Sequence, residues 1–380
     1  MTRILLSCGE PSGDLYAAAL VEALRRRQPD IDVFGLGGER FAAAGGRLIE
    51  DFHGLSVTGL TEALKVIPRS FRTLTRLVRA ARDQRPAALV LIDYPDFNFR
   101  LMSRIKRLGI PVIYYVSPQL WAWRAGRIKT MRRHVDRVLP IFPFEEAIYR
   151  REGIDVRFVG HPLIDLARPR QPREQFLRQL TLDPGKPVIG LLPGSRTNEL
   201  ERIAPVIAGA IPRILERVPD AQFVVARAPN LDDALFESLG LSAVALRIVD
   251  GQTDDVLNAS DAVVTASGTA TVQTALYGKP MVVLYKLSPM TYRLGKPLAL
   301  VDMYAMVNLI AGRRIVVELI QDACTAEAVA DEAVRLITDA AYRAAMSAAL
   351  DTVRLKLGGS GASDRAADAV LDVIHSKDAP

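Results

Sequence analysis

Cysteine is scarce in this sequence of 380 residues: only Cys8 and Cys324 occur, far apart and without a CxxC spacing. Such sparse usage excludes a disulfide framework and a structural zinc site, and it is typical of proteins in a reducing compartment. Clusters with a metal-ligand spacing are missing too. Asp30 and Asp32 form a DxD pattern, but it precedes a strand at the wrong edge of the expected fold. We therefore expect no catalytic metal and no cofactor.

Long apolar runs are also missing. No stretch approaches the roughly 18 apolar residues of a membrane-spanning helix. The apolar run near the N-terminus is too short for a secretory signal and ends at the acidic Glu10. We therefore expect a cytoplasmic protein.

The composition is that of a soluble globular protein, with 49% hydrophobic and 24% charged residues. The length is sufficient for two domains with separate cores. The formal net charge of +6 favours an anionic partner, such as a nucleotide, a phosphorylated ligand or a membrane surface. Nucleic acid is not expected among the partners, because no nucleic-acid-binding motif is recognised.

Short β-type runs alternate with helical patterns along the chain, as in parallel sheets built from βαβ units. Strands are expected at residues 4–6, 88–92, 111–116 and 157–159, and then at 188–192, 222–226, 262–265 and 281–285. Residues 160–175 contain three prolines and are typical of a linker. We predict an α/β protein with two doubly wound, Rossmann-like domains facing a cleft, at residues 1–165 and 166–357. A C-terminal helix at 358–380 follows, and its return to the first domain is one option.

The first motif with chemical content is GEPSGD, residues 9–14, where the first strand turns into a helix. Ligands of open parallel sheets bind at the carboxyl ends of the strands, so this turn should line the cleft. It is not the GxGxxG dinucleotide motif, because Glu10 and Asp14 would repel a pyrophosphate. Ser12 either caps the helix or faces the ligand. Because carboxylates suit sugar hydroxyls, we assign this turn to the acceptor substrate.

The second motif is DYPDFN, residues 93–98, directly after a strong strand. Pro95 should hold Tyr94 extended, so that Asp93 stays at the strand tip and points to the cleft. A half-shielded aspartate in that place can act as general base on a hydroxyl. The alternative is a structural carboxylate bonded to nearby backbone amides.

Three carboxylates of these two motifs compete for the role of general base. Asp93 is the preferred candidate, and Glu10 is the second catalytic candidate. Asp96 fits better at the start of the following helix, as a cap or first-turn acid. We place Ser12, Asp14 and Asn98 on the acceptor-binding side.

The third motif is LPGSR, residues 192–196, again between a strand and a helix. Gly194 and Ser195 leave the backbone amides open to a ligand, and Arg196 adds a guanidinium. A helix N-terminus with an arginine is a site for diphosphate. The motif lacks the lysine of a GxxxxGK loop, so nucleotide hydrolysis is not indicated. The alternative is an ordinary turn with a solvated arginine.

The fourth motif is ASGTA, residues 266–270. Its small residues Ser267, Gly268 and Thr269 stand at a helix N-terminus and can admit phosphate. Gln273 follows one helical turn later on the same face and could reach ribose hydroxyls. Alone this motif is weak, but with the third motif in the same half it predicts a pocket for a nucleotide diphosphate.

A basic amphipathic helix is expected at residues 68–82. Four arginines at spacings of three or four form one stripe beside the apolar Phe71: Arg69, Arg72, Arg76 and Arg79. Such a helix can dock on an anionic membrane surface, or it can pack its apolar face inward as an ordinary surface helix. The residues leave both interpretations open.

Other polar and aromatic residues favour structural interpretations. His161, within GHP at 160–162, is more typical of a hinge or a satisfied polar residue than of a catalytic base. Trp121 and Trp123 fit a hydrophobic core better than a platform for a sugar.

The order of these motifs resembles the lipid-A-disaccharide synthase family, glycosyltransferases of the GT-B fold. The likeness runs through nearly the whole chain. It rests on GEPSGD (9–14), DYPDFN (93–98), YVSPQLWAWR (115–124), GHP (160–162), LPGSR (192–196), SGTA (267–270) and VNLIAGR (307–313).

This resemblance implies an inverting transfer of 2,3-diacylglucosamine from UDP to the 6-hydroxyl of 2,3-diacylglucosamine 1-phosphate. Asp93 then takes the position of the family's general base. Arg196 and Asn308 match positions tied to substrate handling, and we place Asn308 on the donor side. One departure is Gln273, where the family often has glutamate. The amide keeps the hydrogen-bonding reach but loses the charge, which leaves the ribose assignment open.

The resemblance also implies how the protein meets its partners. Two acylated substrates require an enzyme on the inner face of the cytoplasmic membrane, attached peripherally through the basic helix. The oligomeric state stays open between a monomer and a homodimer. The alternatives are another UDP-sugar enzyme of the same fold, such as an N-acetylglucosamine transferase or a 2-epimerase, and a non-catalytic sugar or nucleotide binder.

Overall fold

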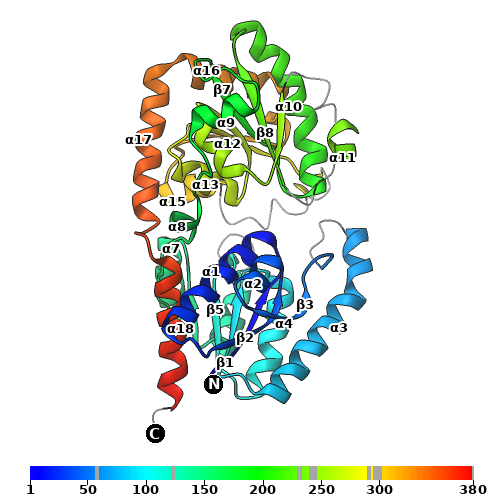
Figure 1. Cartoon of the computed structure of the whole chain (residues 1–380), viewed down its shortest axis with the longest axis vertical. Helices are drawn as coiled ribbons and strands as arrows, with labels where there is room; N and C mark the ends of the chain where they lie inside the picture. Colours follow the sequence, from blue (N-terminus) through cyan, green and yellow to red (C-terminus); the bar gives the residue numbers. More distant parts are fainter. Residues whose placement is uncertain are drawn as a thin grey trace. The chain divides into compact units, whose positions relative to one another are not determined.

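The computed structural model describes residues 1–55, 60–120, 125–228, 231, 233–238, 246–288, 292–293 and 302–378. The chain divides into two compact units. Unit 1 consists of Met1–Asp165 together with Leu357–Pro380, and unit 2 consists of Leu166–Lys356. Each is an α/β domain with helices around a parallel sheet (Figure 1).

Unit 1 contains a six-stranded parallel sheet in the order β3-β2-β1-β4-β5-β6. Its strands are β1 (Arg3–Cys8), β2 (Asp32–Gly37), β3 (Arg47–Asp51), β4 (Ala88–Ile92), β5 (Val112–Tyr115) and β6 (Arg137–Leu139). Its helices are α1 (Pro11–Arg27), α2 (Glu39–Ala43), α3 (Leu60–Gln84), α4 (Pro95–Lys106), η1 (Ala125–Arg127), α6 (Ile128–His134), α7 (Pro143–Arg151) and α18 (Ala362–Asp378). A short helix, α8 (Leu163–Leu166), lies at the division between the units.

Unit 2 repeats this plan with a second six-stranded parallel sheet, in the order β12-β11-β10-β7-β8-β9. Its strands are β7 (Val188–Leu192), β8 (Gln222–Arg227), β9 (Arg247–Asp250), β10 (Ala262–Ala266), β11 (Met281–Tyr285) and β12 (Val317–Ile320). Its helices are α9 (Arg173–Gln179), α10 (Thr197–Arg217), α11 (Asp233–Ser238), α12 (Thr253–Ala259), α13 (Thr269–Leu276), α15 (Met306–Ala311), η4 (Gln321–Ala323), α16 (Ala326–Thr338) and α17 (Ala340–Lys356).

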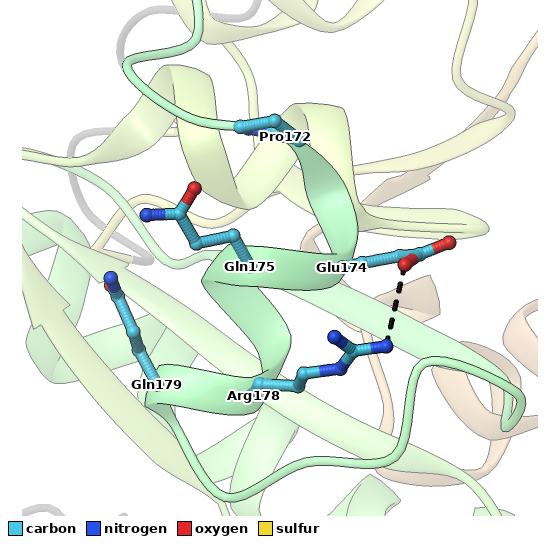
Figure 2. Close-up of a pocket in the computed structure, with 5 residues that line it drawn as sticks. All are labelled: Pro172, Glu174, Gln175, Arg178 and Gln179. Carbon is cyan, nitrogen blue, oxygen red and sulfur yellow. Dashed lines mark hydrogen bonds and ion pairs between the residues drawn. The ribbon is translucent and has the colours of Figure 1, made fainter.

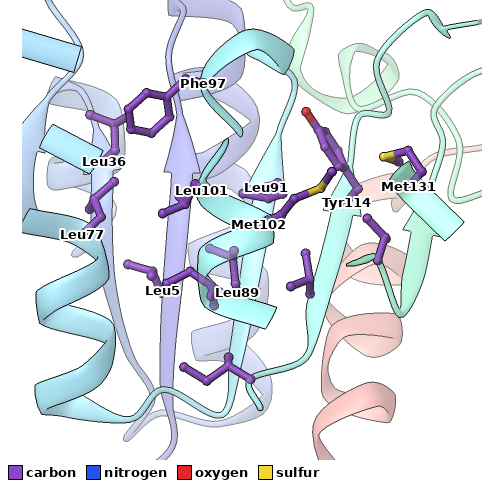
Figure 3. Close-up of a cluster of buried hydrophobic side chains, with 14 of the residues drawn as sticks. Leu5, Leu36, Leu77, Leu89, Leu91, Phe97, Leu101, Met102, Tyr114 and Met131 are labelled. Atoms are coloured by element: carbon purple, nitrogen blue, oxygen red, sulfur yellow. The ribbon is translucent and has the colours of Figure 1, made fainter. Parts of the chain in front are cut away.

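The central strands are apolar along their whole length because helices cover both faces of each sheet. Every residue of β4 and β7 is buried. In unit 1, the apolar side chains of α3 and α4 pack into one cluster with those of β4 and its neighbouring strands. Figure 3 shows part of this cluster. Burial of such contiguous apolar surface is the main stabilising contribution to folds of this kind.

The direction of chain winding reverses at one place in each sheet. In unit 1 the reversal lies between β1 and β4, where Cys8 pairs with Ile92. In unit 2 it lies between β7 and β10, where Leu192 pairs with Thr265. In open α/β sheets, ligands bind outside the carboxyl ends of the strands at such a switch point. All four sequence motifs follow one of these four strands.

The α/β class with two Rossmann-like halves is confirmed, but one expected strand is wrong. Residues 157–159 form no strand: the isolated bridge beside β6 is at Val156, and Arg157 and Val159 donate single backbone N–H groups to Val138 O at 3.0 Å and Pro140 O at 3.2 Å. The chain continues instead to His161, whose backbone N–H donates to Leu357 O at 2.9 Å.

The C-terminal helix α18 belongs to unit 1 and packs against α1 (Figure 1). Ion pairs join the two helices. Arg27 bonds Asp364 at 2.7 Å and also pairs with Asp368. Among the described residues, no helix combines the length and the apolar character needed to cross a bilayer.

Candidate functional site

The turn after β4 carries the preferred base candidate in an unusual backbone conformation. Asp93 and Tyr94 both have positive φ angles, 44° and 48°. Our expectation of an extended Tyr94 is therefore wrong, although a residue before proline usually is extended. The ring of Tyr94 occupies the space beside Gly9, and its hydroxyl donates to Leu55 O at 3.0 Å. These contacts hold the left-handed turn and leave the Asp93 side chain partly exposed.

Glu10 lies across the switch point from Asp93, at the N-terminus of α1. It is the N-cap residue of α1, and its side chain makes no capping bond. Burial raises the pKa of Tyr94 to about 12, with further contributions from the charges of Glu10 and Asp96. These carboxylates therefore surround the same turn. Ser12 lies inside the first helical turn and does not cap the helix.

Asp14 bonds backbone groups of the protein, and its assignment to the acceptor stays a prediction. Its carboxylate is buried, and it accepts backbone N–H groups of Gly38 at 2.7 Å, Arg40 at 3.0 Å and Phe41 at 3.1 Å. These amides belong to the first turn of α2, so Asp14 caps a neighbouring helix from a distance. A carboxylate occupied in this way has little capacity left for a substrate hydroxyl.

Asn98 is buried too and bonds to the turn itself. Its Nδ2 donates to Asp93 O at 2.7 Å, and its Oδ1 accepts the Ser7 hydroxyl at 2.7 Å. The amide thus faces protein groups on both sides, and its acceptor-binding role stays a prediction. Asp96 stands in the first turn of α4, as expected, and pairs with Arg127 at 2.9 Å.

In unit 2, the third motif forms the turn between β7 and α10. Gly194 has φ 124°, and a Cβ there would lie 2.9 Å from the side chain of Glu199. Arg196 is the N-cap residue of α10 and pairs with Glu199 at 3.1 Å. Ser195 is exposed. The turn therefore presents an arginine and the positive end of a 21-residue helix at the same place.

The fourth motif lies beside it, because β10 and β7 are adjacent and parallel. Ser267 donates its hydroxyl to Tyr304 O at 2.8 Å. Gly268 has φ 148°, and within the described part of the chain no atom beyond its own sequence neighbours would lie within 4 Å of a Cβ there. With Thr269 it is exposed at the start of α13. The structure thus brings the two donor-side motifs together within one unit.

Aromatic side chains near this turn were missed by sequence reasoning. The rings of Tyr285 and Tyr304 lie 5.0 Å apart. The pKa of Tyr285 is raised to about 12, mainly by burial and further by Tyr304 and Glu199, whereas the charge of Arg196 acts in the opposite direction. Tyr285 is the last residue of β11, the strand next to β10. A tyrosine at the carboxyl end of a predicted strand was the feature of the sequence that could have indicated its place near the site.

Gln273 has a partner that the sequence did not reveal. Its Nε2 donates to Asp254 Oδ1 at 2.7 Å, and the Tyr277 hydroxyl donates to the same oxygen at 3.1 Å. Burial raises the pKa of Asp254, against the lowering effect of these two donors. The amide nitrogen is thus fixed by a carboxylate.

Asn308 is buried and fully engaged with the protein, in contrast to our donor-binding assignment. Its Nδ2 donates to Val316 O at 3.0 Å and to Glu318 Oε1 at 2.9 Å, and its Oδ1 accepts the Ile315 N–H at 2.7 Å. Glu318 also accepts the backbone N–H of Ala305 at 2.7 Å. Asn308 therefore supports the segment that carries Tyr304, and its assignment to the donor side stays a prediction.

The basic helix α3 divides its apolar residues between core and surface. Leu74 and Leu77 are buried, whereas Ile67 and Phe71 are 42% and 46% exposed. The four arginines of the stripe, Arg69, Arg72, Arg76 and Arg79, are all exposed. Arg76 pairs with Glu50, and Arg79 lies 3.7 Å from Asp83.

A surface hollow of about 580 Å³ is lined by residues of α9 and Pro172, with an ion pair of Glu174 and Arg178 at 3.4 Å (Figure 2). No motif residue lines it, so it is not our candidate site. In the described part of the chain, no group of three or more His, Cys, Asp or Glu could hold a metal ion. Trp121 and Trp123 lie outside the described residues.

His161 has the structural role that its sequence context favours. It is buried, and its Nδ1 accepts the Leu163 N–H at 3.2 Å. Its ring contacts Tyr16 edge-on, with 6.0 Å between centroids, and lies 5.5 Å from the Phe142 ring. Burial lowers the pKa of His161 to about 3.

Solved structures with the same fold include UDP-sugar enzymes. UDP-GlcNAc 2-epimerase from Neisseria meningitidis superposes with a TM-score of 0.70 at 15% identity, covering 98% of this chain and 100% of that one. A calicheamicin glycosyltransferase superposes with a TM-score of 0.59 at 18% identity, covering all of both chains. At such identities the likeness shows the fold alone, which is that of GT-B glycosyltransferases and these epimerases.

Sequence comparison is more specific. The lipid-A-disaccharide synthase of Anaeromyxobacter dehalogenans is 46% identical over 98% of this chain and 98% of its own length. That of Geobacter sulfurreducens is 43% identical over 98% of this chain and 97% of its own. The family model for lipid-A-disaccharide synthetase matches residues 4–372. With a match of this length, the chain belongs to the lipid-A-disaccharide synthetase family.

Proposed function

We propose that this chain is a lipid-A-disaccharide synthase. It transfers 2,3-diacylglucosamine from UDP to the 6-hydroxyl of 2,3-diacylglucosamine 1-phosphate, which yields a β-1′,6-linked disaccharide 1-phosphate and UDP. The observation that carries the proposal is the 46% identity to a lipid-A-disaccharide synthase over almost the full length of both chains. The positions of the four motifs support it, because two motifs follow the adjacent strands at the switch point of each sheet.

Asp93 is the general base in this scheme. It stands at a strand end next to the switch point, and its side chain is partly exposed. Its carboxylate takes the proton of the 6-hydroxyl while that oxygen attacks the anomeric carbon of the donor. General-base assistance of this kind contributes roughly 10²–10⁴-fold to a rate. Glu10, close to the same turn, is proposed to bind acceptor hydroxyls, with Ser12 beside it.

The donor diphosphate is proposed to lie over the turns of unit 2. Backbone N–H groups at Gly194 and Ser195, the N-terminus of α10 and the Arg196 guanidinium supply the positive field. Ser267, Gly268 and Thr269 provide open space and the N-terminus of α13. As the bond between the anomeric carbon and the diphosphate oxygen breaks, charge grows on UDP, and fixed donors stabilise it best where it develops. This scheme requires no metal.

Gln273 is proposed to read the ribose of UDP through its amide oxygen. The bond of its Nε2 to Asp254 fixes the amide group. The oxygen can then accept a hydrogen bond from a ribose hydroxyl.

The exposed face of α3 is proposed to dock on the anionic inner face of the cytoplasmic membrane. Ile67 and Phe71 supply the apolar contact, and the arginines at 69, 72, 76 and 79 supply the charge. Peripheral attachment of this kind would give access to two acylated substrates without a membrane span.

The second candidate is another UDP-sugar enzyme of this fold, because the structure superposes on a UDP-GlcNAc 2-epimerase with a TM-score of 0.70. Product analysis with acylated and non-acylated UDP-glucosamine separates the two. We expect disaccharide only from the acylated donor with the acylated acceptor. An epimerised UDP-sugar, or transfer of the non-acylated sugar at the same rate, would favour the alternative.

A further inference from the structure

We infer that Tyr114, Asn98 and Ser7 are positioning residues that hold the general base by its backbone. The inference rests on the proposed role of Asp93. Neither Tyr114 nor Ser7 is assigned to a substrate, and the Asn98 amide, which we expected on the acceptor side, bonds Ser7 and the Asp93 carbonyl. All three side chains are completely buried in unit 1.

The carbonyl oxygen of Asp93 is held by two side chains at once. The Tyr114 hydroxyl donates to it at 2.7 Å, and Asn98 Nδ2 donates to it at 2.7 Å. Ser7 in turn donates to Asn98 Oδ1 at 2.7 Å, which orients the amide. The backbone N–H of Asp93 donates to Val116 O at 3.2 Å. Both backbone polar atoms of Asp93 therefore have fixed partners from other elements.

Such anchoring is needed because the turn is strained. Asp93 and Tyr94 are consecutive residues in the left-handed region, and neither is glycine. A conformation of this kind costs free energy and persists only where the surrounding structure determines it from several sides. Without the anchors, a residue before proline returns to an extended conformation. That change would redirect the side chain of Asp93.

Packing of the core alone would not require polar side chains at these positions. Tyr114 lies in the apolar cluster of unit 1 with residues such as Leu101, Met102 and Met131 (Figure 3). A phenylalanine would fill the same space without a hydroxyl to satisfy. A buried polar group is stabilising only with its partner in place. The partner of this hydroxyl is the carbonyl of the residue that performs the chemistry.

A small displacement of a catalytic group can have a large effect on rate, since a shift of about 1 Å can cost 10²-fold. We therefore expect Tyr114→Phe to lower kcat about tenfold or more, with the KM for the UDP-sugar donor unchanged. Ser7→Ala should lower kcat in the same direction by a smaller factor, because it loosens Asn98 only.

Tyr149→Phe is the matched control. The Tyr149 hydroxyl is also buried and donates to a backbone carbonyl, that of Pro118, at 3.1 Å. The two variants lose the same kind of hydrogen bond, but only Tyr114 contacts the Asp93 carbonyl. We expect wild-type kcat for Tyr149→Phe. Equal losses of kcat in both variants would mean that the hydroxyl of Tyr114 serves general stability, and would overturn the inference.

The decisive experiment is a double-mutant cycle between Tyr114→Phe and Asp93→Asn, measured as kcat with saturating substrates. If Tyr114 acts through Asp93, the double variant turns over as slowly as Asp93→Asn alone, because residues that act as a unit are not additive. Independent, multiplying losses would overturn the inference. If Tyr114→Phe does not fold by circular dichroism, Ser7→Ala enters the same cycle.

This cycle also distinguishes failure of the inference from failure of the proposed function. Wild-type turnover of Asp93→Asn would show that Asp93 is not the base. A slow Asp93→Asn combined with an additive Tyr114→Phe would leave the base in place and remove only its positioning by Tyr114.

Discussion

The aromatic ring of Tyr94 fills the space that a side chain at residue 9 would need. A Cβ on Gly9 would lie 2.2 Å from Tyr94 Cδ1 and 2.3 Å from its Cγ. Because Cγ is near the base of the side chain, the ring cannot simply swing away. This contact joins the motif after β1 to the motif after β4, and it explains why a glycine stands at the first position of the sequence GEPSGD.

We predict that Gly9→Ala displaces Tyr94 and with it the turn at Asp93. Turnover should fall at least about tenfold, while UDP binding by unit 2 stays at the wild-type level. Steady-state kinetics and calorimetry with UDP measure the two effects. Gly359→Ala is the matched control, because no described residue other than its sequence neighbours has an atom within 4 Å of a Cβ there. Wild-type turnover of Gly9→Ala would contradict the contact's role.

Arg196→Ala should weaken UDP binding about 10- to 100-fold, as expected for losing a hydrogen bond to a charged group. The effect is reinforced because Glu199, now paired with Arg196 at 3.1 Å, would face the diphosphate alone. Isothermal calorimetry with UDP gives the Kd. Arg213→Ala on the same helix serves as control, since its side chain bonds only Gly209 O among the described contacts. Unchanged affinity in Arg196→Ala would remove this residue from the donor site.

Charge reversal on α3 tests the membrane contact. The double variant Arg69→Glu, Arg72→Glu should reduce partitioning onto vesicles containing anionic phospholipid at least about 30-fold, from roughly 1 kcal/mol for each arginine lost. Vesicle sedimentation measures it. A variant with the same change of charge in unit 2, Arg178→Glu with Arg213→Glu, should bind as the wild type does. Equal losses in both would indicate non-specific attraction.

His161 predicts a pH dependence of stability. Burial lowers its pKa from the ordinary value of 6.5 to about 3, so the unfolded chain binds a proton between these values that the folded chain does not. Above pH 6.5 the histidine is neutral in both states, so it costs no stability. As the pH falls from 6.5 towards 3, protonation of the unfolded chain lowers the free energy of unfolding. From pH 8 to pH 5, the wild type should lose about 2 kcal/mol relative to His161→Gln. Urea unfolding of both proteins at pH 8 and pH 5 measures this. The same difference in the free energy of unfolding between the two proteins at the two pH values would disprove the prediction.

The strands of both switch points could be predicted because they are short apolar runs that end in turn residues. The runs at 88–92 and 188–192 coincide with β4 and β7. Neither β6 nor β12 was predicted: β6 has only three residues, and β12 is partly exposed and contains the charged Glu318 within its apolar residues. Their place in the sheet is determined by pairing with a neighbouring strand.

Roles of single polar residues were harder to predict, because their partners are distant in the sequence. Asp14 bonds amides at residues 38–41, and Asn98 bonds Ser7, which is 91 residues away. Motif membership suggested substrate contact for both residues, whereas tertiary structure gives them structural partners. The conformation of Tyr94 shows the same limit, because packing on Gly9 overrides the local preference before proline.

Product analysis of the complete reaction tests the central claim most directly. The chain is supplied with UDP-2,3-diacylglucosamine and 2,3-diacylglucosamine 1-phosphate, and the products are followed by mass spectrometry for the wild type and Asp93→Asn. We predict equal amounts of disaccharide 1-phosphate and UDP, and turnover roughly 10²–10⁴-fold lower in Asp93→Asn with donor affinity little changed. Release of UDP without disaccharide, or wild-type turnover by Asp93→Asn, would contradict the proposed transfer by this base.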